Sequence, residues 1–369
     1  MIGPGLPLII DTDPGVDDAV ALLLASASPE VELRAVTSVY GNVPLVSTTA
    51  NAGRILALAG RSDVPFAAGA DRPLVHPQPE RAEAWHGDDG LGGRAAALPA
   101  GAAPDPRGAV ALMAEVLRTS EVPVTIAAIG PLTNIALLLA VHPGLVRRIG
   151  RIVVMGGSFG AGNTTGAGEF NIHCDPEAAH RVLTQAEVPV TLVPLDLTMR
   201  CLANRAWLDA LATAGPRCAA LASVITPYRA VFRRRYGIDA VALHDAVAVL
   251  ELIVPGALRT TPMPVRVACD LGPARGTTVP TLDPASGSSV PTLDPASGST
   301  VPTLDPASGS SVPTHDPASG STVPTLDPAS GSSVPERSAR PSGPWVHVAL
   351  DADTDAVLTA VLERLRRLG

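Results

Sequence analysis

The sequence contains no lysine, and all 27 of its basic residues are arginines. This absence excludes any mechanism that needs a catalytic lysine, such as Schiff-base chemistry or the lysine of a phosphate-binding P-loop. Basic charge is not in excess either, because the formal net charge is −8. Surfaces that bind nucleic acid usually carry clustered arginine and lysine, so we expect no nucleic-acid partner.

Cysteine is scarce, and no segment suits membrane insertion. The four cysteines form no CxxC pair: Cys174, Cys201, Cys218 and Cys269. We therefore predict reduced thiols and a cytoplasmic location. The apolar amino-terminal run lacks a basic flank and is interrupted by Asp11, which is unlike a signal peptide. The longest apolar stretch, residues 126–146, contains Gly130, Pro131 and Asn134, so we expect no membrane partner.

Five tandem copies of an 11-residue unit, TLDPASGSSVP with small variations, occupy residues 281–335. Each unit is rich in Pro, Gly and Ser and has at most one Leu and one Val that could pack. We predict a disordered insert at 278–335, with a short β-solenoid or a partner-docking repeat as the alternative. Residues 1–277 and 336–369 then form a single α/β domain.

Outside the repeats, short β-rich apolar runs alternate with helical patterns rich in Ala and Leu. The predicted strands are residues 6–10, 31–37, 122–128, 151–155, 188–194, 264–269 and 345–350, and the predicted helices are 16–27, 46–59, 133–140, 175–185 and 354–368. This alternation is typical of a mostly parallel central sheet with helices on both faces, a Rossmann-like α/β fold. Ligands bind such sheets at the carboxyl ends of the strands.

Four carboxylates lie within eight residues at the end of the first predicted strand: Asp11, Asp13, Asp17 and Asp18. One of Asp17 and Asp18 could be purely structural, because acidic residues in a first helical turn cap backbone N–H groups. Four together repel one another unless a cation neutralises them. Oxygen ligands without a soft neighbour favour Ca²⁺ over Mg²⁺ or zinc.

These carboxylates belong to the segment Asp11-Thr-Asp13-Pro-Gly-Val-Asp17-Asp18-Ala19, which resembles the DxDPGxDDA hallmark of the inosine-uridine-preferring nucleoside hydrolases. Further matches follow in family order: Gly41-Asn42, the loop that begins at His86, Gly130-Pro-Leu-Thr-Asn134, Glu169-Phe-Asn171, Leu195-Asp-Leu-Thr198 and His244-Asp245. On this resemblance the protein is identified as a member of that family, whose enzymes use calcium to hydrolyse ribonucleosides to ribose and free base.

The resemblance also assigns roles to single residues. The calcium ligands are Asp13, Asp18, Asp245 and the backbone carbonyl of Ile129. Asp13 is the base that takes a proton from a calcium-bound water, and His244 assists the leaving nucleobase. The substrate-binding set is Asp17, Asn42, His86, Asn163, Glu169, Asn171 and His244. Dimers and tetramers are usual in the family, so we expect a homodimer or a homotetramer.

Several alternatives stay open at this point. Contacts to the nucleobase are expected from aromatic and arginine side chains: Trp85, Tyr228, Arg234, Arg235 and Tyr236. For the arginines, a solvated helix face is the competing interpretation. The sequence does not separate purine from pyrimidine substrates. A non-catalytic nucleoside-binding protein and a haloacid-dehalogenase-type phosphatase, suggested by Ile10-Asp11-Thr-Asp13, are the alternative functions.

Overall fold

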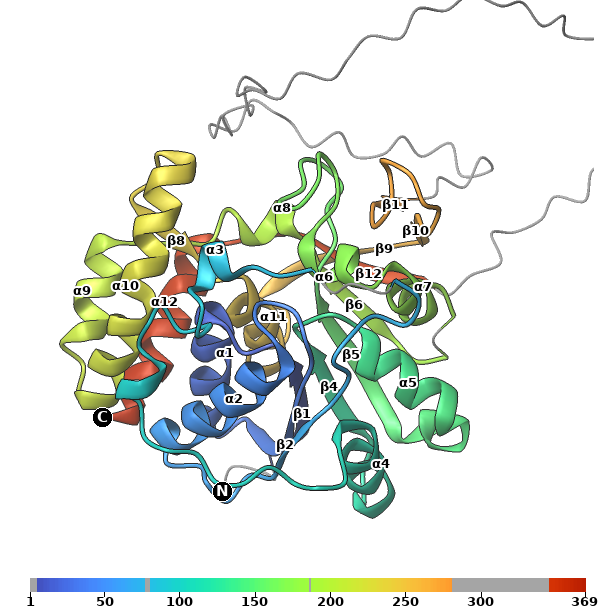
Figure 1. Ribbon diagram of the computed structural model, residues 1–369, viewed down its shortest axis with the longest axis horizontal. Coiled ribbons are helices and arrows are strands. Elements are labelled where there is room, and N and C mark those ends of the chain that lie inside the picture. Colours follow the sequence, from blue (N-terminus) through green and yellow to red (C-terminus); the bar gives the residue numbers. More distant parts are fainter. Residues whose placement is uncertain (1–4, 77–79, 186, 281–344) are drawn as a thin grey trace, which may run out of the picture. The chain divides into compact units, whose positions relative to one another are not determined.

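The computed structural model describes residues 5–76, 80–185, 187–280 and 345–369. The repeats at 281–335, and the predictions made about them, lie outside the described residues. The main element is an eight-stranded sheet with the order β3-β2-β1-β4-β5-β6-β12-β9 (Figure 1). Its strands are β1 (Leu6–Thr12), β2 (Val31–Ser38), β3 (Phe66–Ala68), β4 (Val124–Ala128), β5 (Ile149–Met155), β6 (Val190–Val193), β9 (Leu258–Met263) and β12 (Val346–Ala352). Only β9 runs antiparallel to its neighbour, β12.

Helices cover both faces of this sheet, as the side-chain alternation of β1 illustrates. Leu8 and Ile10 belong to one buried cluster and Ile9 belongs to another, because successive strand residues point to opposite faces. The first cluster contains residues of α1 (Val16–Ser26), α2 (Leu45–Ala59), α9 (Arg205–Ala212), α10 (Pro216–Tyr236), α11 (His244–Ile253) and α12 (Thr354–Leu365). The second contains residues of α4 (Ala109–Thr119), α5 (Thr133–Val141) and α7 (Pro176–Gln185). The predicted fold class is confirmed.

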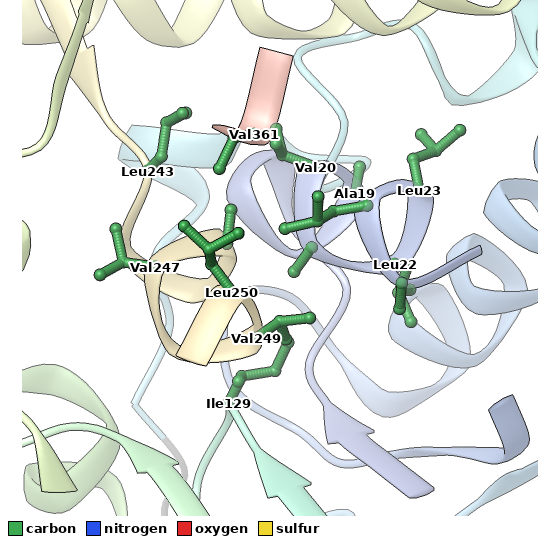
Figure 2. Packing of buried hydrophobic residues seen from close by; sticks show 14 of the residues in the cluster. Ala19, Val20, Leu22, Leu23, Ile129, Leu243, Val247, Val249, Leu250 and Val361 are labelled. Atoms are coloured by element: carbon green, nitrogen blue, oxygen red, sulfur yellow. The ribbon is translucent and has the colours of Figure 1, made fainter. Parts of the chain in front are cut away.

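Helices α1 and α11 are core helices that pack against each other. Every residue of α11 is buried, and so is every residue of α1 except Ser26. Figure 2 shows Val20 of α1 on the side facing Leu250 of α11, with Val361 of α12 beside them. A helix that is apolar on all sides belongs in the interior. The two helices therefore hold their first turns, which carry acidic residues, in fixed positions.

Most predicted elements are confirmed, with shifted ends. Strand β1 continues to Thr12, two residues beyond its predicted end, so Asp11 lies inside it. The predicted strand 264–269 does not join the central sheet; it forms β10 (Val265–Val267), which pairs with β11 (Thr278–Pro280). Because β11 pairs in this way, the described fold continues three residues past the predicted boundary at 277. A second small sheet joins β7 (Leu202–Asn204) to β8 (Ala240–Ala242).

Helix α10 is the longest described helix, with 21 residues. It contains Pro227 in its interior and three consecutive arginines in its last turn. Neither α10 nor any other helix in the described part of the chain is long and apolar enough to cross a bilayer.

Candidate active site

Residues that follow the carboxyl ends of the central strands meet in one pocket. Asp13 comes directly after β1, Ile129 directly after β4, and Met155 is the last residue of β5. The full lining is Asp13, Asp17, Asn42, Ala82, Trp85, His86, Ile129, Met155, Asn163, Thr164, Glu169, Phe170, Asn171, Leu195, Met199, Tyr228, Phe232, Tyr236, His244 and Asp245. Of the metal-binding, catalytic and sugar-binding residues predicted from the sequence, only Asp18 is missing from this lining. Asp18 is completely buried.

Three carboxylates form a compact buried group. Asp17, Asp18 and Asp245 each place an oxygen within 4.8 Å of the others, although α1 and α11 are far apart in the sequence. Asp13 is not in this trio but is joined to it by Asn42. The Asn42 side-chain amide donates hydrogen bonds to the Asp13 carbonyl oxygen and to Asp18 Oδ2, each with a length of 3.1 Å.

The Asp13 side chain is held by the chain segment after β2. The backbone N–H of Asn42 donates to Asp13 Oδ2 over 2.8 Å. Gly41 has a φ of +155°, and a Cβ atom there would lie only 2.0 Å from Asp13 Oδ2. Any other residue at position 41 would displace the carboxylate, which explains the Gly-Asn pair found in the sequence.

Asp18 combines a structural contact with its place in the carboxylate trio. It occupies the third position of α1 and its Oδ2 accepts a hydrogen bond from the backbone N–H of Gly15 at 2.8 Å. Its other oxygen accepts a short hydrogen bond from the Thr12 hydroxyl. Asp18 therefore both caps helix α1 and belongs to the carboxylate trio.

Burial and mutual repulsion both act against ionisation of these groups. For each of the four, loss of hydration is the main cause that raises the pKa: Asp17 rises to about 8, and the pKa values of Asp13, Asp18 and Asp245 also rise. Neighbouring carboxylates add to the rise at Asp13, Asp17 and Asp245. None of the described residues that line the pocket is an arginine. A bound cation would neutralise the cluster, and an all-oxygen ligand set suits a hard ion.

Asp11 lies apart from this group, although it precedes Asp13 by only two residues. Its Oδ1 accepts hydrogen bonds from the Thr37 hydroxyl at 2.5 Å and the Asn134 amide at 2.8 Å. Asn134 also donates to the Ser38 carbonyl, so it ties β1 and β2 together at their ends. Asn134, the last residue of the Gly-Pro-Leu-Thr-Asn segment, therefore has a structural role: it fixes the Asp11 side chain and the end of β2.

Another part of the pocket lining consists of Glu169, Asn163 and Asn171. Glu169 caps the short helix α6 (Phe170–Cys174), accepting hydrogen bonds from the backbone N–H groups of Asn171 and Ile172. Burial raises its pKa to about 7. The Asn171 amide donates to the Ile129 carbonyl over 3.1 Å, and Asn163 Oδ1 accepts from the Phe170 N–H over 2.9 Å.

Both pocket histidines are held as neutral rings. Burial, together with the other histidine, lowers the pKa of His86 to about 3, and burial lowers that of His244 to about 4. His86 Nδ1 accepts a hydrogen bond from the Val16 N–H over 3.1 Å. An N–H can only donate, so neutral His86 carries its proton on Nε2. His244 Nδ1 lies 2.7 Å from the buried hydroxyl of Thr198.

An aromatic wall forms the remaining side of the pocket. We use this name for four residues, Trp85, Tyr228, Phe232 and Tyr236, from α3 (Glu83–His86) and α10. Trp85 stacks on Tyr236 with ring centroids 5.7 Å apart, and Tyr228 stacks on His86 at 5.2 Å. The chain contains only ten Phe, Trp and Tyr residues. Because four of these ten form the aromatic wall, aromatic side chains are concentrated at this pocket.

The structure separates the aromatic from the arginine candidates for base contact. Tyr228 and Tyr236 line the pocket, whereas Arg234 and Arg235 are exposed and do not line it. Arg235 covers the Trp85 ring, with its guanidinium carbon 4.9 Å from the ring centroid. Sequence reasoning missed Phe232. Its spacing of four residues from both Tyr228 and Tyr236 would have placed all three on one helix face.

Comparison with known proteins points to one family. The family described as inosine-uridine preferring nucleoside hydrolase matches residues 8–359. The pyrimidine-specific ribonucleoside hydrolase RihA of Salmonella agona (strain SL483) is 41% identical over 276 residues, which cover 74% of this chain and 88% of that protein. RihA of Klebsiella pneumoniae subsp. pneumoniae is also 41% identical, with the same coverage.

Two solved structures extend the likeness to nearly the whole chain. A plant nucleoside hydrolase, PpNRh1, has a TM-score of 0.78 at 28% identity and covers 98% of this chain and 99% of its own. A purine-preferring ribonucleoside hydrolase from Gardnerella vaginalis has a TM-score of 0.77 at 25% identity and covers 98% of each chain. This chain belongs to the inosine-uridine preferring nucleoside hydrolase family and is a hydrolase of the N-glycosidic bond of ribonucleosides.

Proposed function

We propose that the enzyme cleaves pyrimidine ribonucleosides in preference to purine ones, with calcium in the carboxylate cluster and Asp13 as the general base. The observation that carries the mechanism is the buried trio Asp17, Asp18 and Asp245 with Asp13 beside it. Such a concentration of carboxylates costs stability unless it serves a cation, because buried charges of one sign repel.

The proposed ligands are Asp13, Asp18, Asp245 and the carbonyl oxygen of Ile129. These atoms are hard oxygen donors, and the Ile129 carbonyl receives one hydrogen bond from Asn171, which leaves a lone pair for an ion. Calcium, when bound, would supply the positive charge that the pocket lining lacks and would lower the pKa of a nearby water. Asp17 is itself a member of the buried trio, with an oxygen within 4.8 Å of Asp18 and Asp245, so it is in reach of either the ion or a sugar hydroxyl.

Asp13 then acts on the attacking water. With the cluster neutralised, its carboxylate is ionised and takes a proton from the water that attacks the anomeric carbon of ribose. The surrounding carboxylates stabilise the positive charge that develops on the sugar ring. His244 uses Nε2 toward the leaving base, because Nδ1 is occupied by Thr198.

The ribose hydroxyls are bound by groups that donate and accept hydrogen bonds. We assign them to a set that surrounds the pocket: Asp17, Asn42, Asn163, Glu169 and Asn171. His86 contributes a donor, since its proton lies on Nε2. The asparagine amides can both donate to and accept from sugar hydroxyls, and the carboxylates accept from them, which an apolar lining could not do.

The pyrimidine preference is supported by the relatives. The bacterial hydrolases at 41% identity are named pyrimidine-specific, whereas the structure named purine-preferring shares 25%. We expect kcat/KM for uridine or cytidine to exceed that for inosine by at least about tenfold, equivalent to roughly 1.4 kcal/mol.

A panel of nucleosides tests both parts of the proposal. Ribose release is measured for uridine, cytidine, inosine, guanosine and adenosine, each with EDTA, and again after calcium or magnesium is added back. Release that is lost in EDTA and restored best by calcium supports the proposed metal. No release from any nucleoside refutes the activity, and faster release from inosine or guanosine refutes the pyrimidine preference.

We also propose that residues 1–277 and 336–369, together with β11 at Thr278–Pro280, form one catalytic domain, and that the enzyme works in the cytoplasm as a homodimer or homotetramer. Closed symmetric assemblies are common among soluble enzymes. Size-exclusion chromatography with light scattering measures the assembly directly, and a monomer at micromolar concentration contradicts it.

A further inference from the structure

The loop between β5 and α6, residues 156–168, carries part of the pocket lining. We call it the substrate loop, because its residues Asn163 and Thr164 line the pocket. Six of its thirteen residues are glycines: Gly156, Gly157, Gly160, Gly162, Gly166 and Gly168. Glycine has many accessible conformations and no side chain to pack, so a loop of this composition needs support from elsewhere to hold one shape.

Thr278 of β11 supplies that support with a single hydroxyl group. Its Oγ1 accepts a hydrogen bond from the Ser158 N–H over 2.9 Å and donates one to the Ser158 carbonyl over 2.6 Å. Both residues are buried, with exposed fractions of 3% for Thr278 and 1% for Ser158. One side chain therefore satisfies both backbone groups of a buried loop residue, and its loss would leave two unpaired.

The loop is shaped to receive this side chain. Gly157 has a φ of +77°, and a Cβ atom there would lie 3.1 Å from both Oγ1 and Cγ2 of Thr278. A larger residue at position 157 would therefore be strained in its backbone and pressed against Thr278. The glycine and the threonine fit as a pair.

The chain just before Thr278 supports the neighbouring part of the pocket. The Arg275 guanidinium makes a two-point ion pair with Glu177 of α7, with both distances 2.8 Å. The Arg275 carbonyl oxygen lies 3.1 Å from His173 Nδ1 of α6. Segment 275–278 thus contacts the substrate loop, α6 and α7, and it is held firmly enough to act as an anchor.

The anchored loop in turn presents Asn163. The Asn163 N–H donates to the Gly168 carbonyl over 3.2 Å, and its Oδ1 accepts from the Phe170 N–H over 2.9 Å. These contacts use the side-chain oxygen and leave the amide nitrogen for a ligand. Thr278 itself does not line the pocket.

We propose that Thr278 is a positioning residue: it holds the substrate loop in the shape that presents Asn163 and Thr164 to the ribose of the substrate. This inference rests on the proposed function, because it takes the loop to bind the sugar. Sugar contacts of this kind act on substrate and transition state alike, so their loss raises KM more than it lowers kcat.

The test replaces Thr278 by Val in the full-length enzyme, which removes the hydroxyl and keeps the shape. We expect KM for uridine to rise about tenfold while kcat changes less than about threefold. Thr278→Ser keeps the hydroxyl and restores KM. Thr119→Val is the matched control, because the Thr119 hydroxyl donates within helix α4, to the Glu115 carbonyl. We expect this control to leave kcat and KM unchanged.

A double mutant tests whether Thr278 works through Asn163. Asn163→Ala alone raises KM, and adding Thr278→Val to it has little further effect if both act through one loop. Independent, additive effects overturn the proposal. So does a Thr278→Val enzyme with lowered kcat and unchanged KM, which indicates only a loss of folded protein.

Amide hydrogen exchange gives a readout that does not depend on activity. Thr278→Val should exchange faster at residues 156–168 than the parent enzyme, and no change there overturns the inference. If Thr278→Val does not fold, Gly157→Ala disturbs the same contact from the loop side and should give the same two results. A parent enzyme that releases no ribose, by contrast, refutes the proposed function while the exchange result still decides the role of Thr278.

Discussion

Two sides of the pocket, the carboxylate side and the aromatic wall, are built on different physical principles. On the carboxylate side, Asp13 and Asp18 are fixed by hydrogen bonds from backbone N–H groups and from Asn42. On the other side, the rings of the aromatic wall pack against one another, with centroids 5.1 to 6.3 Å apart. Hydrogen bonds fix the direction of single atoms, whereas ring packing fixes only shape and area.

This difference suggests a division of labour. A buried carboxylate that loses a partner becomes unpaired, which costs more than a lost apolar contact. The carboxylate side therefore suits the chemical step, which needs atoms in set positions, and the aromatic side suits selection among bases. We expect changes on the first side to act mainly on kcat and changes on the second to act mainly on KM.

Replacing Asp13 by Asn should have the largest effect. The variant keeps an oxygen for the Asn42 N–H but cannot take a proton, so kcat should fall about 10²- to 10⁴-fold. Steady-state kinetics on uridine with calcium present measures this, and a thermal melt confirms folding. Asp63→Asn, at an exposed ion pair with Arg61, is the control. A kcat near that of the parent would show that Asp13 is not the base. It would also contradict the view that the carboxylate side acts mainly on kcat.

Metal removal should make stability depend on pH. Without a cation, burial and then Asp18 raise the pKa of Asp17 to about 8, far above its value in the unfolded chain. The folded state then binds more protons between about pH 4 and 8, so the free energy of unfolding falls as the pH rises through that window.

Thermal melts in EDTA at pH 5.5 and pH 8 measure this effect. We expect a lower Tm at pH 8, by roughly 2–4 °C for each kcal/mol lost, and calcium should remove most of the difference. Asp17→Asn should reduce the slope in EDTA. A Tm that rises with pH in EDTA would contradict the view of the cluster as a group of carboxylates held short of ionisation.

Changes in the aromatic wall should have smaller effects and act on binding. Phe232→Leu removes three ring contacts, each worth about 0.5–1.5 kcal/mol at most, so we expect KM for uridine to rise about 2- to 10-fold. Its kcat should change less than its KM. Arg233→Ala, on the exposed side of the same helix, is the control. A loss of kcat as large as that of Asp13→Asn would end the proposed division of labour.

Deletion of residues 281–335 should have the smallest effect. The segment separates β11 from β12, and loop-closure free energy changes by only about 0.6 kcal/mol per doubling of loop length. We expect kcat/KM for uridine to stay within about tenfold of the parent. A larger loss would show that the repeats contribute to the pocket or to assembly, and the Thr278 contact would be the first place to examine.

Much of the carboxylate side could be predicted from the sequence because its signals are local. The strand, the turn and the first helical turn that carry Asp13 to Asp18 are contiguous, and their spacing favours one cluster. The same local view grouped Asp11 with them. The structure separates it, because Asp11 belongs to β1 itself and its oxygen is engaged by Thr37 and Asn134.

The aromatic side could be predicted only in part because it depends on packing. Residue type alone makes Tyr228 and Tyr236 candidates for base contact. That Phe232 lines the pocket while Arg234 does not depends on which face of α10 packs against α3. The support from Thr278 was not predicted at all, since it joins residues 120 positions apart. Threonine is common in strands, and nothing in its neighbours indicates a contact with a loop so distant.

The sequence by itself determined the alternating α/β fold, the ordered set of family segments and the residue types able to bind an ion and a sugar. These properties follow from local periodicity and from short motifs whose residues lie close along the chain. Only the tertiary structure decided that Asp11 is held apart from the carboxylate cluster, that His86 donates from Nε2, and that Thr278 holds the substrate loop. Each of these depends on distances between segments far apart in the chain, which packing of the core helices and strands sets and periodicity does not encode.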